Sequence, residues 1–324
     1  MLTVTLPANF SVIQRNDDNV ACVKVSGNLK TDAREVIIEA RTVLEDGRTG
    51  ASTDWVEICR CSGEGVFSGE LVVPAGGWYR LDVQAASDGK VIDKFSVERF
   101  GVGEVFITAG QSNSANHGES PQKPWDDRVA AYHIGAWRQA CDPQPGATGE
   151  GGTPWPILGS MLAENLQMPI GFTSVGVGGS SLAEWLESPG YYKQLVRAAC
   201  ALGAFRAILW HQGESDAICH TSKQDYVDGV TRLIRMSASE SGVDAPWVVA
   251  EASFIKEDPR FEHEIAEAQR ELWKRGVALR GPCTNDMIGS SFRYDEIHFT
   301  NMGLRVHAQR WFAFLWTHFF ADKI

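Results

Sequence analysis

The sequence predicts an α/β protein in which a small all-β segment precedes a parallel sheet covered by helices. The chain has 324 residues, more than a single hydrophobic core usually organises. Its first third contains short alternating strands separated by turn residues, without helical periodicity. From residue 104 onward, apolar runs of strand length alternate with helical patterns. We therefore expect two domains, residues 1–103 and residues 104–324.

The first domain is expected to be a β-sandwich. Its clearest strand, residues 78–85, places Leu81 and Val83 on one face and Arg80 and Asp82 on the other. No combination of catalytic residue types occurs in this domain, which favours an accessory role. Further short strands are expected at 21–25, 35–42, 55–59, 69–73 and 94–97.

The second domain is expected to contain a parallel sheet wrapped by helices. Leu158, Met161 and Leu162 show the spacing of one helical face. In such sheets ligands bind beyond the carboxyl ends of the strands, which is where the polar clusters of this chain fall. Strands are expected at 104–109, 170–177, 204–210 and 247–252, and helices at 157–166, 191–202, 223–239, 261–275 and 301–320.

The charge balance narrows the range of partners. With 41 acidic and 30 basic residues the formal net charge is −11, so we expect neither nucleic acid nor an anionic membrane as a partner. No segment approaches the roughly 18 apolar residues of a membrane span. No secretory signal is visible, which leaves a cytoplasmic protein or one exported after trimming of a signal. The 7 cysteines are scattered, so we expect no metal and no cofactor. Nothing in the sequence indicates an oligomeric state.

The first polar cluster, residues 110–113, follows the first strand of the second domain. A serine in such a turn exposes its hydroxyl group and offers its own backbone N–H to a developing oxyanion, which makes Ser112 a candidate nucleophile. Gly110 allows another part of the backbone to approach closely, and Asn113 can cap the next turn. Taken alone, a serine and an asparagine near a strand end more often cap a helix.

The second and third clusters supply further polar groups. After the second strand, Gly178 and Gly179 form a tight turn or direct a backbone N–H at negative charge. Ser181 stands where a dinucleotide-binding fingerprint needs its third glycine, and no Walker sequence follows. After the third strand, residues 210–216 read WHQGESD, which is denser in polar groups than a structural turn requires.

The fourth cluster lies just before the last expected helix. Asp295 precedes His298 by three residues, so within a turn its carboxylate can reach Nδ1, fix the tautomer and leave Nε2 free as a base. Together the clusters supply a hydroxyl nucleophile, a backbone donor, an amide side chain and an Asp–His pair at one edge of the sheet. These groups are those needed for acyl transfer through a serine intermediate.

A long irregular segment, residues 135–156, interrupts the alternation of strands and helices. Segments of this kind inside an α/β domain are usually functional or mobile. Its residues Trp137 and Trp155 either stack on a substrate or hold the loop in place, and the sequence leaves both readings open.

The four clusters resemble the sequence blocks of the SGNH hydrolase superfamily: GQSN at 110–113, GGSSLAEW at 178–185, WHQGESD at 210–216 and DEIH at 295–298. They are most similar to its branch of sialate O-acetylesterases and acetylxylan esterase-like carbohydrate esterases, over residues 104 to about 320. The resemblance implies a three-layer, flavodoxin-like SGNH hydrolase domain with Ser112 as nucleophile and His298 as base. It also implies an oxyanion hole built from the Ser112 N–H, Gly178 or Gly179, and the Gln212 side chain.

The third block departs from the superfamily pattern, which carries Gly-x-Asn-Asp where this chain reads Gln-Gly-Glu. The departure puts the amide donor on Gln212 and offers Glu214 as an alternative carboxylate for His298, after Asp295 as the first choice.

Several other residues in or near the blocks are weaker candidates. Gln111, Asn113 and His211 are expected to line the substrate cleft, together with the two tryptophans of the irregular segment. The histidines outside the blocks are expected at the surface or in structural roles, and they are His117, His133, His220, His263, His307 and His318.

The resemblance implies a serine esterase that removes O-acetyl groups from carbohydrates, such as sialic acid or xylan-type glycans, through an acetyl-enzyme intermediate. Two alternatives stay open: a general short-chain acyl esterase, and a non-catalytic glycan-binding protein. Because inactive descendants usually lose the serine or the histidine, the presence of both Ser112 and His298 argues against the second alternative.

Overall fold

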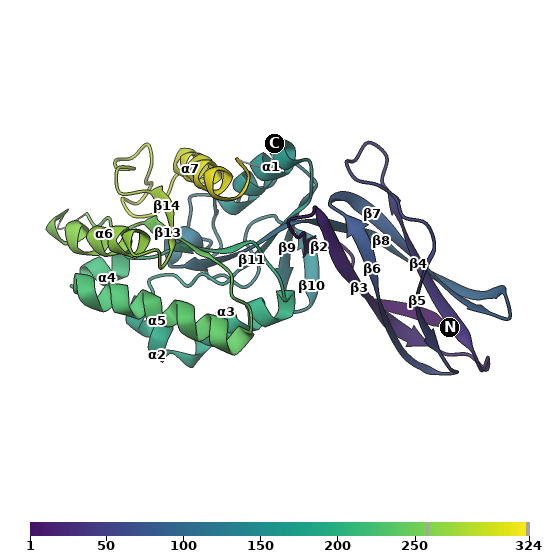
Figure 1. Cartoon of the computed structure of the whole chain (residues 1–324). Helices are drawn as coiled ribbons and strands as arrows, with labels where there is room; N and C mark the ends of the chain where they lie inside the picture. The colour runs from purple at the N-terminus through teal and green to yellow at the C-terminus, as the bar shows by residue number, and fades with distance from the viewer. Residues whose placement is uncertain (257–258, 322–324) are drawn as a thin grey trace.

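The computed structural model describes residues 1–256 and 259–321 (Figure 1). A β-rich part formed by the first third of the chain lies beside an α/β part formed by the rest. Residues 322–324, the last three of the expected second domain, lie outside the described residues.

The β-rich part is built from strands around a core of its own. Its strands are β1 (Leu2–Leu6), β2 (Ser11–Gln14), β3 (Val20–Leu29), β4 (Val36–Leu44), β5 (Val56–Cys61), β6 (Gly65–Pro74), β7 (Gly76–Ser87) and β8 (Lys90–Gly110). Strand β3 pairs with β1 and β6, whereas β4 pairs with β5 and β7, and β7 pairs with β8. Alternate residues of both groups are buried, as the period of two predicts, and Val23, Ile38 and Leu81 belong to one apolar cluster.

The sheet of the α/β part has β8 near its centre. The additional strands are β9 (Val129–His133), β10 (Ala136–Gln139), β11 (Ile170–Ser174), β12 (Ala207–His211), β13 (Trp247–Glu251) and β14 (Leu279–Cys283). They lie in the order β10-β9-β11-β8-β12-β13-β14, and every pair except β10–β9 is parallel. From β11 to β14 this is the doubly wound order 2-1-3-4-5, with the reversal of winding at β8. Ligand sites in such sheets lie at the reversal, beyond the strand ends.

Helices cover both faces of this sheet (Figure 1). They are α1 (Trp155–Leu166), α2 (Leu182–Glu187), α3 (Pro189–Leu202), α4 (Glu214–Ile218), α5 (Lys223–Ser241), α6 (Pro259–Lys274) and α7 (Asn301–Phe319). One face packs against α1 and α7, with Leu158 and Trp311 in the shared core. The other packs against α2 to α6, with Leu195 and Val230 in the shared core. The expected layers of helix, parallel sheet and helix are therefore present.

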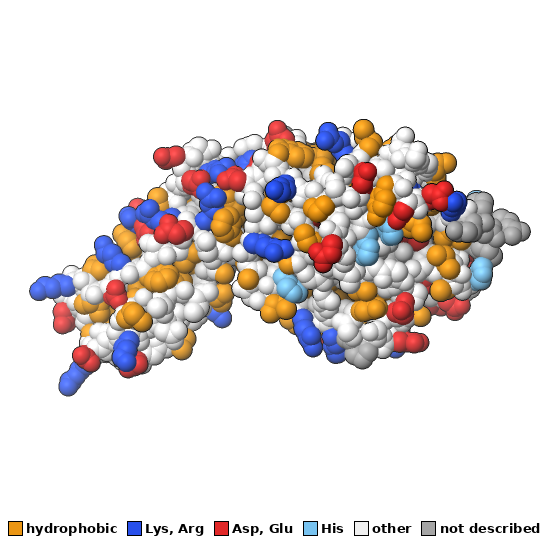
Figure 2. All heavy atoms as spheres, turned by 180° about the vertical axis from the view of Figure 1, so that it is seen from behind, with side chains coloured by type: hydrophobic (Ala, Val, Ile, Leu, Met, Phe, Trp, Pro, Cys, Tyr) orange, Lys and Arg blue, Asp and Glu red, His pale blue; other side chains and the backbone are white. Residues whose placement is uncertain are grey.

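The surface is mixed in character. On the face shown in Figure 2, acidic and basic side chains are interspersed, and apolar side chains form small groups between them. None of the helices in residues 1–256 and 259–321 is long and apolar enough to span a membrane.

Strand β8 runs without a break through the expected domain boundary at residue 103. Its first half pairs with β7 and its second half with β11 and β12, so a single strand serves both parts of the molecule. Glu104 lies at the crossing and is fully buried. Its carboxylate forms ion pairs with Arg15 at 2.7 Å and Arg206 at 2.6 Å, and accepts a hydrogen bond from Gln14 at 2.8 Å. These contacts join the N-terminal chain, β8 and the segment leading into β12.

Replacement of Glu104 by alanine is expected to lower the free energy of unfolding by about 3 kcal/mol, because it leaves the buried Arg15 without its counter-charge. Urea denaturation followed by fluorescence measures the change. Glu64→Ala is the matched control: its pair with Lys30, at 3.8 Å, is largely exposed, so the expected loss is under about 0.5 kcal/mol. Equal losses for the two variants would contradict the role assigned to Glu104.

Candidate active site

The Ser112 turn begins where β8 ends. Gly110 has φ +127°, and a Cβ atom there would lie 2.0 Å from the carbonyl oxygen of His211, so only glycine fits. The next backbone N–H, that of Gln111, donates to the same carbonyl at 3.0 Å. A short 3₁₀ turn, Ser112–Ser114, follows. The close approach of β8 and β12 therefore sets the position at which Ser112 leaves the sheet.

His298 lies in the loop that precedes α7, and the Asp295 carboxylate holds it. His298 Nδ1 lies 2.6 Å from Asp295 Oδ2, and Oδ1 accepts the backbone N–H groups of Ile297 at 3.0 Å and His298 at 2.6 Å. Burial acts to raise the pKa of Asp295, but the hydrogen bonds from the ring and backbone of His298 outweigh it and lower that pKa. The carboxylate is therefore ionised at neutral pH, and Nε2 is left free to act as a base.

Asn113 connects the serine turn with the histidine loop. Its Nδ2 donates to the carbonyl oxygen of Ile297 at 3.3 Å and to Glu214 Oε1 at 3.0 Å. The structure thus brings together the first, third and fourth clusters of the sequence. Glu214, the alternative carboxylate for His298, is bonded to Asn113, and the carboxylate on Nδ1 of His298 is that of Asp295.

The two candidate glycines differ in the state of their N–H groups. The N–H of Gly178 donates to Thr148 Oγ1 at 2.7 Å. Gly179 is exposed with φ +69°, and no described residue accepts a hydrogen bond from its N–H. Gly179 is therefore the glycine with a donor to offer an incoming ligand.

Gln212 packs beneath the serine turn, and its Nε2 lies 3.4 Å from Oε1 of Gln111, the residue before Ser112. Its side chain is fully buried, and Nε2 donates to the carbonyl oxygen of Ser180 at 3.2 Å and to the carboxylate of Asp216. Its Oε1 accepts from the hydroxyl group of Tyr226 at 3.0 Å. An oxyanion donor has to point at the place where the charge develops. These contacts pair the amide with protein groups around the serine turn, and the place of Gln212 in the oxyanion hole stays a prediction.

Gln111, expected in the cleft, instead links two clusters behind it. Only 4% of the residue is exposed, and its Oε1 accepts the backbone N–H groups of Gly213 at 3.2 Å and Ser215 at 3.1 Å. Its contacts hold the turn after β12 against the turn after β8.

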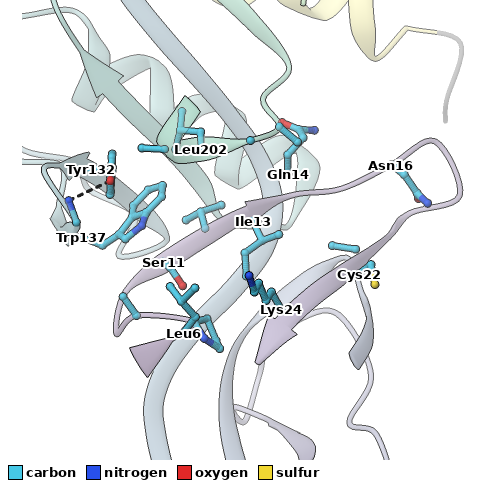
Figure 3. Close-up of a pocket in the computed structure, with 18 of the residues that line it drawn as sticks. Leu6, Ser11, Ile13, Gln14, Asn16, Cys22, Lys24, Tyr132, Trp137 and Leu202 are labelled. Atoms are coloured by element: carbon cyan, nitrogen blue, oxygen red, sulfur yellow. Dashed lines mark hydrogen bonds between the residues drawn. The ribbon is translucent and has the colours of Figure 1, made fainter. Parts of the chain in front are cut away.

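The two tryptophans of the irregular segment do not face a substrate at Ser112. Trp155 is fully buried at the start of α1, and its indole N–H donates to the carbonyl oxygen of Ser114 at 2.9 Å, so it holds the loop in place. Trp137 lies on β10 and lines a separate cavity of about 560 Å³ with Tyr132 and Leu202 (Figure 3). Neither tryptophan is part of the candidate active site.

His211, another cleft candidate, is part of a buried histidine pair. Its ring lies 4.7 Å from that of His307. Nε2 of His211 lies 3.1 Å from Thr284 Oγ1, and Nε2 of His307 accepts the indole N–H of Trp311 at 2.8 Å. Burial lowers the pKa of both histidines. The pair is therefore neutral and structural.

This pair predicts a loss of stability in mild acid. Below pH about 6.5 the two histidines take up protons in the unfolded chain but not in the folded protein. The free energy of unfolding therefore decreases as the pH is lowered, by up to about 1.4 kcal/mol per pH unit for each histidine. Urea denaturation between pH 7 and 5.5 measures the slope. His307→Gln should flatten it by about one histidine's share. An unchanged slope in that variant would contradict the assignment.

His117 is a member of the site that the sequence analysis placed outside it. Its ring stacks on that of His298, with centroids 5.4 Å apart, and its Nε2 lies 3.4 Å from Thr148 Oγ1. The hydroxyl group of Tyr294 donates to its carbonyl oxygen at 3.2 Å. Burial, and then the neighbouring His298, lower the pKa of His117. No pattern in the sequence indicates this contact, because His117 lies outside the four polar clusters.

Within the described residues, no group of three or more His, Cys, Asp or Glu side chains is arranged to hold a metal ion. The residues of the candidate active site offer a serine hydroxyl group as a nucleophile, a histidine held by a carboxylate as a base, and backbone N–H groups as donors.

Comparisons with known proteins place this arrangement in a family. The family model described as "Carbohydrate esterase, sialic acid-specific acetylesterase" matches residues 102–316. A probable carbohydrate esterase of Arabidopsis thaliana is 25% identical over 136 residues, which are 40% of this chain and 49% of the relative. The match thus spans about half the length of that curated relative.

Two crystal structures show the same fold. A carbohydrate acetylesterase from Xanthomonas citri aligns over 100% of this chain and 76% of its own, with a TM-score of 0.63 and 18% identity. A protein of Arabidopsis thaliana aligns over 67% of this chain and 98% of its own, with a TM-score of 0.52 and 21% identity. The family match covers the α/β part and includes every residue of the serine, glycine and histidine turns described above. The chain belongs to the carbohydrate esterase family of sialic acid-specific acetylesterases.

Proposed function

We propose that the protein is a serine esterase that removes O-acetyl groups from carbohydrates through an acetyl-enzyme intermediate. The observation that carries this proposal is the contact between Asp295 and His298 Nδ1, in a loop that Asn113 bonds to the Ser112 turn. Family membership supports the acetyl group and the sugar.

In the proposed mechanism, Ser112 Oγ attacks the acetyl carbonyl carbon while His298 Nε2 accepts its proton. The N–H groups of Ser112 and Gly179 donate to the oxyanion that forms. His298 then gives the proton to the sugar oxygen as the C–O bond breaks. Water, activated by the same histidine, hydrolyses the acetyl-enzyme and releases acetate. Asp295 holds the ring and stabilises the imidazolium throughout.

The substrate within this class is an O-acetylated glycan, either a sialic acid or a xylan-type sugar. The family description names sialic acid, and the relative from Xanthomonas citri is a carbohydrate acetylesterase. We further propose that residues 1–103 form an accessory β-sandwich domain, since their strands enclose a core of their own.

Acetate release tests the proposal. The wild-type protein should release acetate from O-acetylated sialic acid or acetylated xylan at a higher kcat/KM than from p-nitrophenyl acetate. The Ser112→Ala variant should release acetate from none of these substrates. Hydrolysis of p-nitrophenyl acetate and butyrate alone would indicate a general short-chain esterase. Binding of glycans without any hydrolysis would indicate a glycan-binding protein.

A further inference from the structure

Glu214 is a buried carboxylate beside the candidate active site. Only 3% of the residue is exposed, at the start of α4. Its Oε1 accepts from Asn113 Nδ2 at 3.0 Å, whereas Oε2 is buried without a hydrogen-bond partner among the described residues. A buried carboxylate with a single hydrogen bond is costly. The hydrogen bond from Asn113 is therefore the contact through which Glu214 can act on the site.

The amide of Asn113 transmits that contact to the histidine loop. While one hydrogen of Nδ2 points at Glu214, the group also donates to the carbonyl oxygen of Ile297 at 3.3 Å. Because an amide nitrogen is planar, an acceptor that fixes one hydrogen also fixes the direction of the other. Glu214 thus selects the orientation in which Asn113 reaches the loop.

The histidine loop is held from both sides at this point. The carbonyl oxygen of Ile297 accepts from Asn113 and from the guanidinium group of Arg293, and the backbone N–H groups of Ile297 and His298 donate to Asp295. Asn113 follows Ser112 directly, and Ile297 precedes His298 directly. The Asn113–Ile297 bond therefore joins the residue after the nucleophile to the residue before the base.

We propose that Glu214 is a positioning residue that acts through Asn113 to hold the His298 loop at the Ser112 turn, an inference that rests on the proposed esterase function. It acts as a hydrogen-bond acceptor with a fixed position, in contrast to Asp295, which contacts the imidazole itself. A glutamine at position 214 retains an acceptor, whereas an alanine does not.

A double-mutant cycle tests the coupling. Glu214→Ala and Asn113→Ala should each lower kcat for p-nitrophenyl acetate by about 10- to 100-fold with KM nearly unchanged, because a small misplacement of reacting groups is costly. The double variant should lose no more than the worse single variant, since both remove one connection. If the loss of kcat in the double variant equals the product of the two single losses, the residues act independently and the proposal is overturned.

A conservative variant separates position from charge, and it keeps the test valid even if the alanine variants fail to fold. Glu214→Gln should retain kcat within about tenfold and should leave the midpoint of the acidic limb of the pH–rate profile unchanged. A loss above about 100-fold, or a midpoint moved to lower pH, would show that the Glu214 charge acts on His298 and would overturn the proposal. Glu251→Gln is the matched control, because Glu251 is a buried carboxylate that pairs with Arg270.

The outcomes also distinguish this inference from the proposed function. If the wild-type protein hydrolyses no ester, the esterase proposal itself fails. If the wild type hydrolyses p-nitrophenyl acetate and Ser112→Ala does not, while the cycle is additive, only the role of Glu214 fails.

Discussion

Replacement of Ser112 by alanine is expected to lower kcat by about 10⁴-fold or more, because no other group can form the acetyl-enzyme. KM should change little, since the N–H donors and the sugar contacts remain. The turn is expected to keep its structure, because Gly110 and Gln111, rather than the serine hydroxyl, anchor it to β12. Steady-state kinetics and a thermal melt of the same preparation measure both effects.

A second variant checks that Ser112 acts with His298. His298→Ala should cost about as much as Ser112→Ala, and the double variant should cost no more than either, because the two residues work as a unit. Labelling with a phosphonate ester should modify Ser112, with the adduct located by peptide mass spectrometry. An adduct on a different residue would overturn the assignment.

Asp295→Asn is expected to lower kcat by about 10³-fold. An asparagine keeps the oxygen that accepts the N–H groups of Ile297 and His298, so the loop should hold its shape. It replaces the other oxygen by a donor facing Nδ1, which favours the wrong tautomer and removes the charge that stabilises the imidazolium. The acidic limb of the pH–rate profile should move to lower pH.

The control for this variant is Asp286→Asn, which removes an exposed carboxylate paired with Arg310. Its kcat should stay within about twofold of the wild type. If Glu214→Gln costs more than Asp295→Asn, then Asp295 is not the residue that orients His298. A small effect of Asp295→Asn with an unchanged pH profile would lead to the same conclusion.

The elements predicted well from the sequence are those determined by local patterns. The helix expected at 223–239 is observed as Lys223–Ser241, because an apolar stripe and the cap at Ser222, whose hydroxyl accepts the N–H of Asp225, are both local. Strand β8 was expected as two strands, since its first half alternates in burial and its second half is buried on both faces. The two burial patterns arise because the two halves of β8 have different neighbouring strands, and those neighbours cannot be read from the local sequence.

The same distinction holds for the candidate site. The contact between Asp295 and His298 was predicted because His298 is the third residue after Asp295. The hydrogen-bond partners of His211 and Gln212 were not, because both lie at the end of a strand that is buried on each side. His117 reaches His298 only through the fold, so no spacing in the sequence indicates it.

The unbroken course of β8 has a consequence for how this protein can be recombined. Evolution and protein engineering exchange modules most readily at exposed linkers, where few contacts cross the junction. Here the covalent route between the β-rich part and the nucleophile is a hydrogen-bonded strand, and its residue Glu104 is tied to both sides. A chimaera joined at residue 103 inherits half of a strand and a carboxylate that has lost Arg15. An exchange of the N-terminal part therefore has to take β2, Arg15 and the whole of β8 from the same protein. The seam then lies in a loop rather than at residue 103.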